Sequence, residues 1–368
     1  MNYDICPHLF GMHDYHDDWV NMVRQAGKQA WCVHTEAVGR DPNDHGGKVY
    51  PDGVINIVRL NHAYGQGHGV IPLPQYYDDF AKRCANFVAA SKNINYVIHA
   101  NEISLAWEAP DDNPIRLTDY VDCYLKCYSA IKSVAPNVKV AQQSPAPWNP
   151  STPDAQDWIT QLAAQLNMAG NKVDWIALHA YTKGYGADKF SNNPTMNPPW
   201  NHRKFGWEAL YEYMQIIPFT HRQLPVIITE VNADSSWQDD PGDWIQQMYA
   251  EVDRWNKGFG NQKILGACPF RWAKHDDRWD MSRHSRAVDD FRAALQHDYR
   301  HNWQSSTSTV NQRCVNAPDG LNLRDMPNGN IITTLQHGTP VEVLSAHDEW
   351  LLVTVAGQRG FVFGQYVT

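Results

Sequence analysis

The sequence predicts an α/β fold, an eight-stranded (β/α)8 barrel, followed by a small all-β barrel. Over roughly the first 300 residues, eight short apolar runs alternate with longer amphipathic stretches. A Ser/Thr-rich segment follows at 301–309, and beyond it only short strand-like runs occur. The length of 368 residues suits one large domain and one small one.

The eight strands of the first part are predicted from short runs rich in β-branched and aromatic residues, at 5–10, 30–34, 55–60, 96–100, 138–142, 175–179, 226–229 and 264–270. Seven amphipathic helices are predicted at 17–26, 75–91, 117–134, 154–168, 204–217, 241–257 and 285–296. Only the connection from the second to the third strand, 41–52, reads as a polar loop. Strands that alternate with helices indicate a parallel sheet, and the count of eight favours a closed TIM barrel over an open, doubly wound sheet.

The residues after the Ser/Thr-rich segment form a separate predicted unit. Short strands are expected at 321–324, 331–335, 340–346, 350–355 and 360–362, separated by turns such as Pro327-Asn328-Gly329. We therefore predict a large domain at 1–300 that would carry the catalytic site, a linker at 301–309 and a small β-barrel at 310–368.

Composition excludes several classes of partner. The formal net charge of −9 disfavours nucleic acid, because binding to a phosphate backbone needs a basic surface. No apolar run is long enough to span a membrane, and no signal peptide is recognisable at the start of this sequence. The seven cysteines are scattered without a CxxC pair, so we expect no metal and no cofactor, and we expect Cys6, Cys32 and Cys268 to be buried thiols.

Polar residues follow several predicted strands, where a barrel of this kind has its active site. Asn101 and Glu102 follow the fourth strand, and Glu230 follows the seventh. The other candidates for substrate binding come after the third, sixth and eighth strands and are Arg59, His62, His179, Tyr181 and Trp272. If the strands are assigned correctly, all these side chains converge on one mouth.

Two carboxylates at one mouth suit cleavage of a glycosidic bond. One must be protonated to donate to the leaving oxygen, and the other must be ionised to attack the anomeric carbon. Arg59 is expected to keep the nucleophile charged, and Asn101 to hold a sugar hydroxyl. An Asn-Glu pair or a Glu after one strand is common by chance. The prediction therefore depends on finding both after the appropriate strands of one barrel.

Aromatic side chains near the same mouth suit the apolar faces of sugar rings. Trp107 and Trp148 lie in predicted loops after strands, like Trp272, and are candidates for substrate binding. Glu36, which follows the second strand, and Glu108, six residues past Glu102, compete with the two chosen carboxylates, since either could line the site instead. His13 and His16 are interpreted as residues of a solvated helix start.

This arrangement resembles the clan A glycoside hydrolases, which are retaining (β/α)8 enzymes. The resemblance is carried by Asn101-Glu102 after the fourth strand and Glu230 at the seventh, with His179, Tyr181 and Trp272 in supporting positions. It implies that Glu102 is the acid/base and Glu230 the nucleophile in cleavage of a β-glycosidic bond. Many clan members have proline after the Asn-Glu pair, where this chain has Ile103.

The C-terminal segment resembles bacterial SH3-like domains, through 321–324, 338–343, Trp350 and 360–362. That resemblance implies a cell-wall peptide or glycan as ligand; a structural appendage is the alternative. Together the two resemblances predict an oligosaccharide or polysaccharide substrate and an extracellular or cell-envelope location. A lysin acting on peptidoglycan and a non-catalytic carbohydrate-binding barrel remain alternative functions.

Overall fold

The structure is a computed structural model. It describes residues 6–39, 47–63, 69–111, 113–148, 158–258, 261–273, 278–301, 303, 312–347, 349–356 and 358–368. The linker predicted at 301–309 lies largely outside the described residues, so the domain boundaries stay a prediction.

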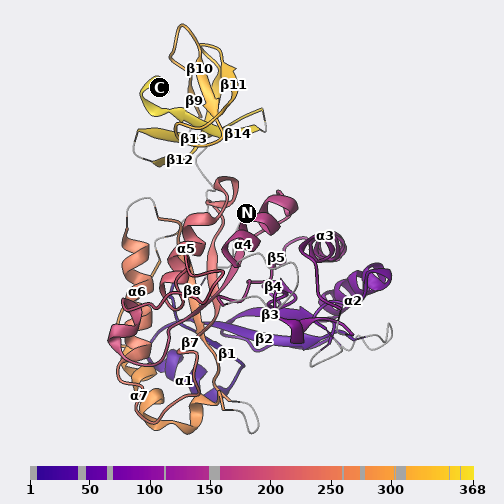
Figure 1. Cartoon of the computed structure of the whole chain (residues 1–368), viewed down its shortest axis with the longest axis vertical. Helices are drawn as coiled ribbons and strands as arrows, with labels where there is room; N and C mark the ends of the chain where they lie inside the picture. Colours follow the sequence, from indigo (N-terminus) through magenta and orange to yellow (C-terminus); the bar gives the residue numbers. More distant parts are fainter. Residues whose placement is uncertain are drawn as a thin grey trace.

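The first part of the chain contains eight parallel strands, as predicted (Figure 1). They are β1 (Gly11–His13), β2 (Trp31–Ala37), β3 (Ile55–Asn61), β4 (Tyr96–His99), β5 (Lys139–Gln142), β6 (Ile176–Tyr181), β7 (Val226–Asn232) and β8 (Ile264–Pro269). Pairing runs in chain order from β1 to β5 and from β6 to β8. This is the strand order of a (β/α)8 barrel, and the fold class predicted from the sequence is confirmed.

Two junctions join these sheets into a barrel. Between β8 and β1, Phe10 pairs in parallel with Ala267, whose backbone N–H donates to the carbonyl of Leu9 at 2.9 Å. Between β5 and β6, the N–H of Asp174 donates to the carbonyl of Val140 at 3.0 Å, and the Asp174 carboxylate accepts from the Val140 N–H at 2.9 Å. The Asp174 side chain thus replaces a ladder hydrogen bond where the two sheets meet.

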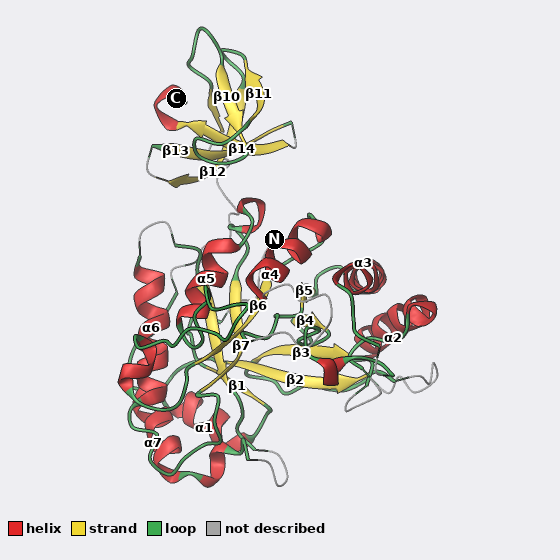
Figure 2. Ribbon diagram, in the orientation of Figure 1, coloured by secondary structure: helices red, strands yellow, loops and turns green. Residues whose placement is uncertain are grey.

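Seven α-helices are described, and they lie outside the strands (Figures 1 and 2). They are α1 (Asp17–Gln25), α2 (Tyr77–Ala90), α3 (Leu117–Val134), α4 (Trp158–Ala169), α5 (Glu208–Ile216), α6 (Trp244–Lys257) and α7 (Ser285–Ala294). The pairs α2 with α3 and α6 with α7 lie side by side. In α2, α3, α6 and α7 most of the residues facing the strands are apolar and buried, which stabilises each helix through its inward stripe.

The barrel interior is filled with large side chains. Trp31, Tyr96 and Trp175 pack edge to face, with ring centroids 5.4 Å apart in both pairs. Gly266 of β8 makes room for this cluster, since a Cβ there would lie 2.4 Å from Cδ1 of Trp31. The packed interior closes the bottom of the barrel and leaves the carboxyl ends of the strands for a site.

Several sequence predictions need correction in detail. The first strand, predicted at 5–10, is observed at Gly11–His13, with single bridge pairs at His8 and Phe10. Strands β6 and β7 extend two and three residues beyond their predicted ends, so Tyr181 and Glu230 lie on strands. Part of the predicted loop 41–52 and the start of the helix predicted at 154 fall outside the described residues.

The cysteines expected to be buried are buried. Cys6, Cys32 and Cys268 are fully inaccessible, and burial raises the pKa of each thiol. A separate cluster of buried side chains lies between α2, α3 and β4. It consists of His99, Cys123 and Cys127, whose nitrogen and sulfur atoms lie within 4.8 Å of one another. Among the described residues, no helix is long and apolar enough to cross a membrane.

The C-terminal part is an antiparallel β-structure. Its strands are β9 (Gln312–Cys314), β10 (Leu321–Arg324), β11 (Ile331–Leu335), β12 (Pro340–His347), β13 (Trp350–Val355) and β14 (Gln358–Phe363), in the order β11-β10-β14-β13-β12-β9. Strand β9 was not predicted from the sequence. A small core of its own, centred on Leu323, Val353 and Val362, fills this unit.

Candidate active site

Glu102 lies in the turn that follows β4. The backbone there is unusual, because Ala100 and Glu102 have positive φ angles of 66° and 30°. Each non-glycine residue in this region costs about 1–3 kcal/mol, and such positions are concentrated at functional sites. The turn is held by a hydrogen bond from the N–H of Leu105 to the carbonyl of Glu102, 2.9 Å long. The Glu102 side chain is buried.

Glu230 lies on β7 and is surrounded by hydrogen-bond donors. Nη1 of Arg59, on β3, lies 2.5 Å from its Oε1. The hydroxyl of Tyr181, on β6, donates to its Oε2 at 2.8 Å. Nε2 of His13, at the end of β1, lies 3.9 Å from Oε1. Residues from three other strands therefore surround this carboxylate, and two of them contact it directly.

His179 on β6 lies between the two carboxyl groups. Its Nδ1 is hydrogen-bonded to Oε1 of Glu102 at 2.7 Å, and its Nε2 lies 3.9 Å from Oε1 of Glu230. One donor atom from each of these three residues lies within 4.8 Å of the others. The set has the ligand types of a metal site, but the Arg59 guanidinium already supplies a cation to Glu230, so the arrangement fits an acid–base pair better.

The surroundings drive the pKa values of the two carboxyl groups apart. Burial raises the pKa of Glu102, as does the nearby Glu230, and hydrogen bonding to His179 offsets only part of that rise. Burial would also raise the pKa of Glu230, but His179, Arg59 and His13 together outweigh it and hold that pKa well below its usual range. The surroundings thus favour the protonated form of Glu102 and the ionised form of Glu230, and acid-assisted displacement needs one carboxyl group of each kind.

A cavity of about 490 Å³ opens above the two carboxyl groups. Seven of the residues predicted for the site line it: Arg59, Asn101, Glu102, Trp107, Trp148, Tyr181 and Glu230. Trp148 packs against the ring of Tyr181, with centroids 4.9 Å apart, and the Trp107 ring is largely exposed at the rim. His179, also predicted, is buried beside the carboxyl groups and holds Glu102.

Two predicted substrate-binding residues are placed elsewhere. His62 is buried and packs edge-on against Phe80 of α2, because side chains alternate along β3, so that Arg59 and Asn61 face the cavity and His62 faces the helix. Trp272 is buried near the start of α1, and its backbone N–H donates to the carbonyl of His13 at 3.1 Å. Phe270 and Trp279 line the cavity on that side instead.

Of the two competing carboxylates, one belongs to the cavity. Glu108 lines it and accepts a hydrogen bond from Nδ2 of Asn101 at 3.0 Å, and burial raises the pKa of Glu108 to about 7. Glu36 instead pairs with Lys48 at 2.5 Å and accepts from the Tyr50 hydroxyl at 3.0 Å. Glu36 is therefore not placed to act on a ligand in this cavity.

Further lining residues were not identified from the sequence. The interpretation of His13 as a solvated residue is wrong, because β1 begins later than predicted and places His13, buried, at the mouth. His16 does mark the helix start, where its ring accepts from the N–H of Asp18. The others are Thr35, Asn61, Asp234, Phe270, Arg271, Arg278 and Trp279, which follow strands without a distinctive motif.

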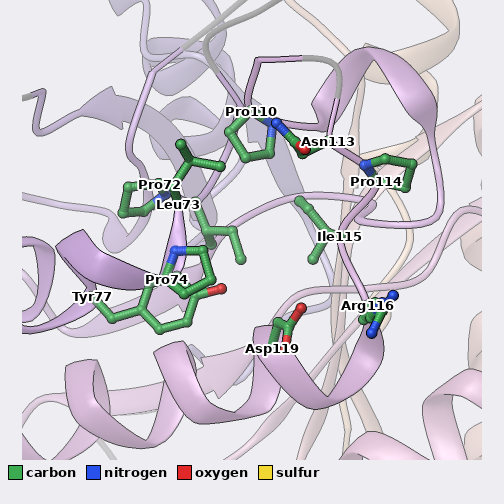
Figure 3. Close-up of a pocket in the computed structure, with 11 residues that line it drawn as sticks. Pro72, Leu73, Pro74, Tyr77, Pro110, Asn113, Pro114, Ile115, Arg116 and Asp119 are labelled. Carbon is green, nitrogen blue, oxygen red and sulfur yellow. The ribbon is translucent and has the colours of Figure 1, made fainter.

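A separate cavity of about 360 Å³ lies between the segments that follow β3 and β4 (Figure 3). Leu73 and Ile115 lie between four proline rings there, with Arg116 and Asp119 at the edge. It shares no lining residue with the cavity above Glu102 and Glu230. It has a single carboxylate, so it offers no acid–base pair.

Comparison with known proteins supports the two-part architecture. Residues 319–368 match the family model of the bacterial SH3 domain. No curated protein matches the chain. Among solved structures, a family 39 glycoside hydrolase from the gut symbiont Bacteroides cellulosilyticus WH2 is similar with a TM-score of 0.53 and 14% identity, over 90% of this chain and 79% of that one.

Two further structures are similar over the barrel. A glucosidase from Croceicoccus marinus has a TM-score of 0.51 and 11% identity, over 80% of this chain and 69% of that one. A family 86 glycoside hydrolase in complex with neoagarooctaose has a TM-score of 0.50 and 13% identity, over 75% of this chain and 54% of that one, so this chain spans about half its length. The chain is thus a TIM barrel with the fold of glycoside hydrolases, followed by a segment that matches the bacterial SH3 domain.

Proposed function

We propose that this chain is a retaining glycoside hydrolase that cleaves a β-glycosidic bond, with Glu102 as acid/base and Glu230 as nucleophile. The observation that carries the proposal is the carboxyl pair itself. Both groups are buried at the carboxyl ends of β4 and β7, and oxygens of the two lie within 4.8 Å of each other. Retaining enzymes hold their carboxyl groups about 5–5.5 Å apart, whereas inverting enzymes need about 6.5–9.5 Å to admit a water molecule.

In the first step, an oxygen of Glu230 attacks the anomeric carbon while the bond to the leaving oxygen breaks. The proton of Glu102 passes to that oxygen, so the departing group leaves as a neutral alcohol. The Arg59 and Tyr181 contacts keep Glu230 ionised and aimed before the attack. The product of this step is a glycosyl ester of Glu230.

In the second step, Glu102, now ionised, takes a proton from water as the water oxygen attacks the anomeric carbon. The ester bond to Glu230 breaks, and the carboxylate is restored beside Arg59. Two inversions give net retention of configuration. The raised pKa of Glu102 suits this residue, which must hold a proton in one step and accept one in the next.

The remaining lining residues suit a sugar. Oδ1 of Asn101 is buried and has no hydrogen-bond partner among the described residues, so it is available to accept from a sugar hydroxyl. Trp107 and Trp148 line the same cavity as the carboxyl pair and offer flat apolar faces. Related folds include a glucosidase and an enzyme crystallised with neoagarooctaose, and both descriptions concern carbohydrates.

The experiment that tests this function follows the configuration of the first product by proton NMR, with aryl β-glycosides of several sugars as substrates. We expect hydrolysis with the β-anomer formed first. Formation of the α-anomer first would contradict retention. Binding of sugars without any hydrolysis would favour the non-catalytic barrel, in which the opposed pKa values of Glu102 and Glu230 would have no role.

For the C-terminal unit we propose a role in binding cell-wall peptide or glycan, which would place the chain outside the cell or in its envelope. The supporting observation is a cavity of about 430 Å³ lined by Trp350, Phe363 and Tyr366 together with Asp319 and Arg324. A peptidoglycan lysin is the second candidate function, because the match to the bacterial SH3 domain suits a wall substrate. A fall in turbidity of purified bacterial walls would favour the lysin, and unchanged walls would favour another polysaccharide.

A further inference from the structure

A second cavity adjoins the one above the carboxyl pair. It has a volume of about 480 Å³ and is lined by Trp148, Lys183, Pro194, Thr195, Met196, Asn197 and Phe205. Trp148 lines both cavities, so the two spaces meet at this residue. A ligand seated between Glu102 and Glu230 that extends past Trp148 therefore enters this second space.

The outer wall of the second cavity is a hairpin in the segment between β6 and α5. Thr195 pairs antiparallel with Lys204, the N–H of Met196 donates to the carbonyl of Arg203 at 3.0 Å, and the N–H of Phe205 donates to the carbonyl of Pro194 at 2.7 Å. The base of the hairpin is fixed to α5, since Oδ1 of Asn193 accepts from the N–H of Glu208 at 3.1 Å. Such a wall is formed before a ligand binds, which lowers the entropic cost of binding.

An ion pair joins a residue that lines the second cavity to a residue that lines the first. Nζ of Lys183, which lines the second cavity, lies 3.0 Å from Oδ2 of Asp234, which lines the first. The same ammonium group lies over the ring of Phe205, 4.5 Å from its centroid. The ring faces of Trp148 and Phe205 are thus accompanied by polar groups that can reach hydroxyls, which is the combination that sugar rings require.

We infer that the cavity between Trp148 and Phe205 is a subsite for further sugar units of the same chain that is cut between Glu102 and Glu230. This inference rests on the proposed function and makes it more specific: the substrate is an oligosaccharide or polysaccharide that extends over the hairpin. Hydrolysis should become more efficient with chain length until the subsite is filled.

The test compares substrates of different length in matched variants of the full chain. The substrates are an aryl β-glycoside and ladders of β-linked gluco-, manno-, xylo- and galacto-oligosaccharides of two to six units. The readout is the ratio of kcat/KM for the longest substrate that is cleaved to kcat/KM for the aryl glycoside. Phe205→Ala removes one face of the subsite, and Trp200→Ala removes an aromatic ring from the same hairpin that does not line the cavity.

We expect Phe205→Ala to lower the ratio about tenfold, the effect of losing one aromatic contact with a sugar, and Trp200→Ala to leave it unchanged. Lys183→Ala should also lower the ratio. Hydrolysis that does not depend on chain length, or equal effects of Phe205→Ala and Trp200→Ala, would overturn the subsite while leaving the proposed function intact. Absence of hydrolysis on every substrate would instead remove the proposed function, and the subsite with it.

Discussion

Arg59 and Glu230 form a buried ion pair across the mouth of the barrel. The two residues stand on β3 and β7, four strands apart, and Nη1 of Arg59 lies 2.5 Å from Oε1 of Glu230. Both side chains are less than a tenth exposed, so water screens their attraction weakly. The pair aims the carboxylate at the cavity and keeps it ionised.

Removal of the Arg59 charge is expected to impair Glu230. In Arg59→Met the carboxylate remains buried without the Arg59 cation, so its pKa rises. In the proposed mechanism Glu230 acts in the ionised form, so activity is expected to fall as pH falls through its pKa. The acid limb of the kcat/KM profile should therefore move to higher pH, with a loss of activity on the order of a hundredfold at neutral pH. Arg59→Lys keeps the positive charge, so its acid limb should move less than that of Arg59→Met. If the acid limb lay at the same pH in both variants, Arg59 would not act on Glu230 through its charge.

Glu108 is expected to tune the acid/base. Burial raises the pKa of Glu108 to about 7, so it is neutral below that pH and negative above it. Its charge disfavours ionisation of Glu102, which is protonated at the start of the proposed first step. Glu108→Gln removes the charge and can still accept from Asn101, so the basic limb of kcat/KM should move to lower pH. Glu36→Gln, outside the cavity, is the control, and identical profiles for both variants would rule out the coupling.

The C-terminal unit is expected to be dispensable for small substrates. The chain truncated after Trp303 should keep kcat for an aryl glycoside within about twofold, because the carboxyl pair and its cavity belong to the barrel. Its action on insoluble walls or polysaccharide should weaken. Trp350→Ala in the full chain should reproduce the weaker action, since Trp350 lines the cavity of that unit. Loss of activity on the soluble substrate in a folded truncation would show that the unit helps to build the site.

The fold class could be predicted from the sequence because the patterns that indicate its strands and helices are strong. Apolar runs of β-branched residues predict most of the strands. The parallel register of β2 to β5 is known only from the structure. The first strand was misplaced because the apolar run at 5–10 is more strand-like than Gly11–His13, whose pairing with β2 only the barrel determines. The strands predicted for β6 and β7 were too short, because polar residues that face the barrel interior resemble the polar residues that end a strand.

The candidate site could be predicted only in part. Glu102 and Glu230 could be found because each directly follows an apolar strand. His62 was predicted to bind substrate, but Asn61 lines the cavity instead, because the side-chain direction at the end of β3 depends on where the alternation stops. Trp272 does not line the cavity, and the backbone hydrogen bond that holds it near β1 is to His13, far away in the sequence. The hairpin that walls the second cavity comes from a long connection whose shape no local pattern specifies.

Azide rescue of the two carboxyl variants tests the roles proposed for Glu102 and Glu230 most directly. In Glu230→Ala the space left by the carboxylate admits azide, and we expect a glycosyl azide of inverted configuration. In Glu102→Ala an aryl glycoside with a good leaving group should still form the glycosyl-enzyme, and azide should then release a product of retained configuration. Equal losses in both variants on activated and unactivated substrates, with no response to azide in either, would contradict the assignment of these two residues.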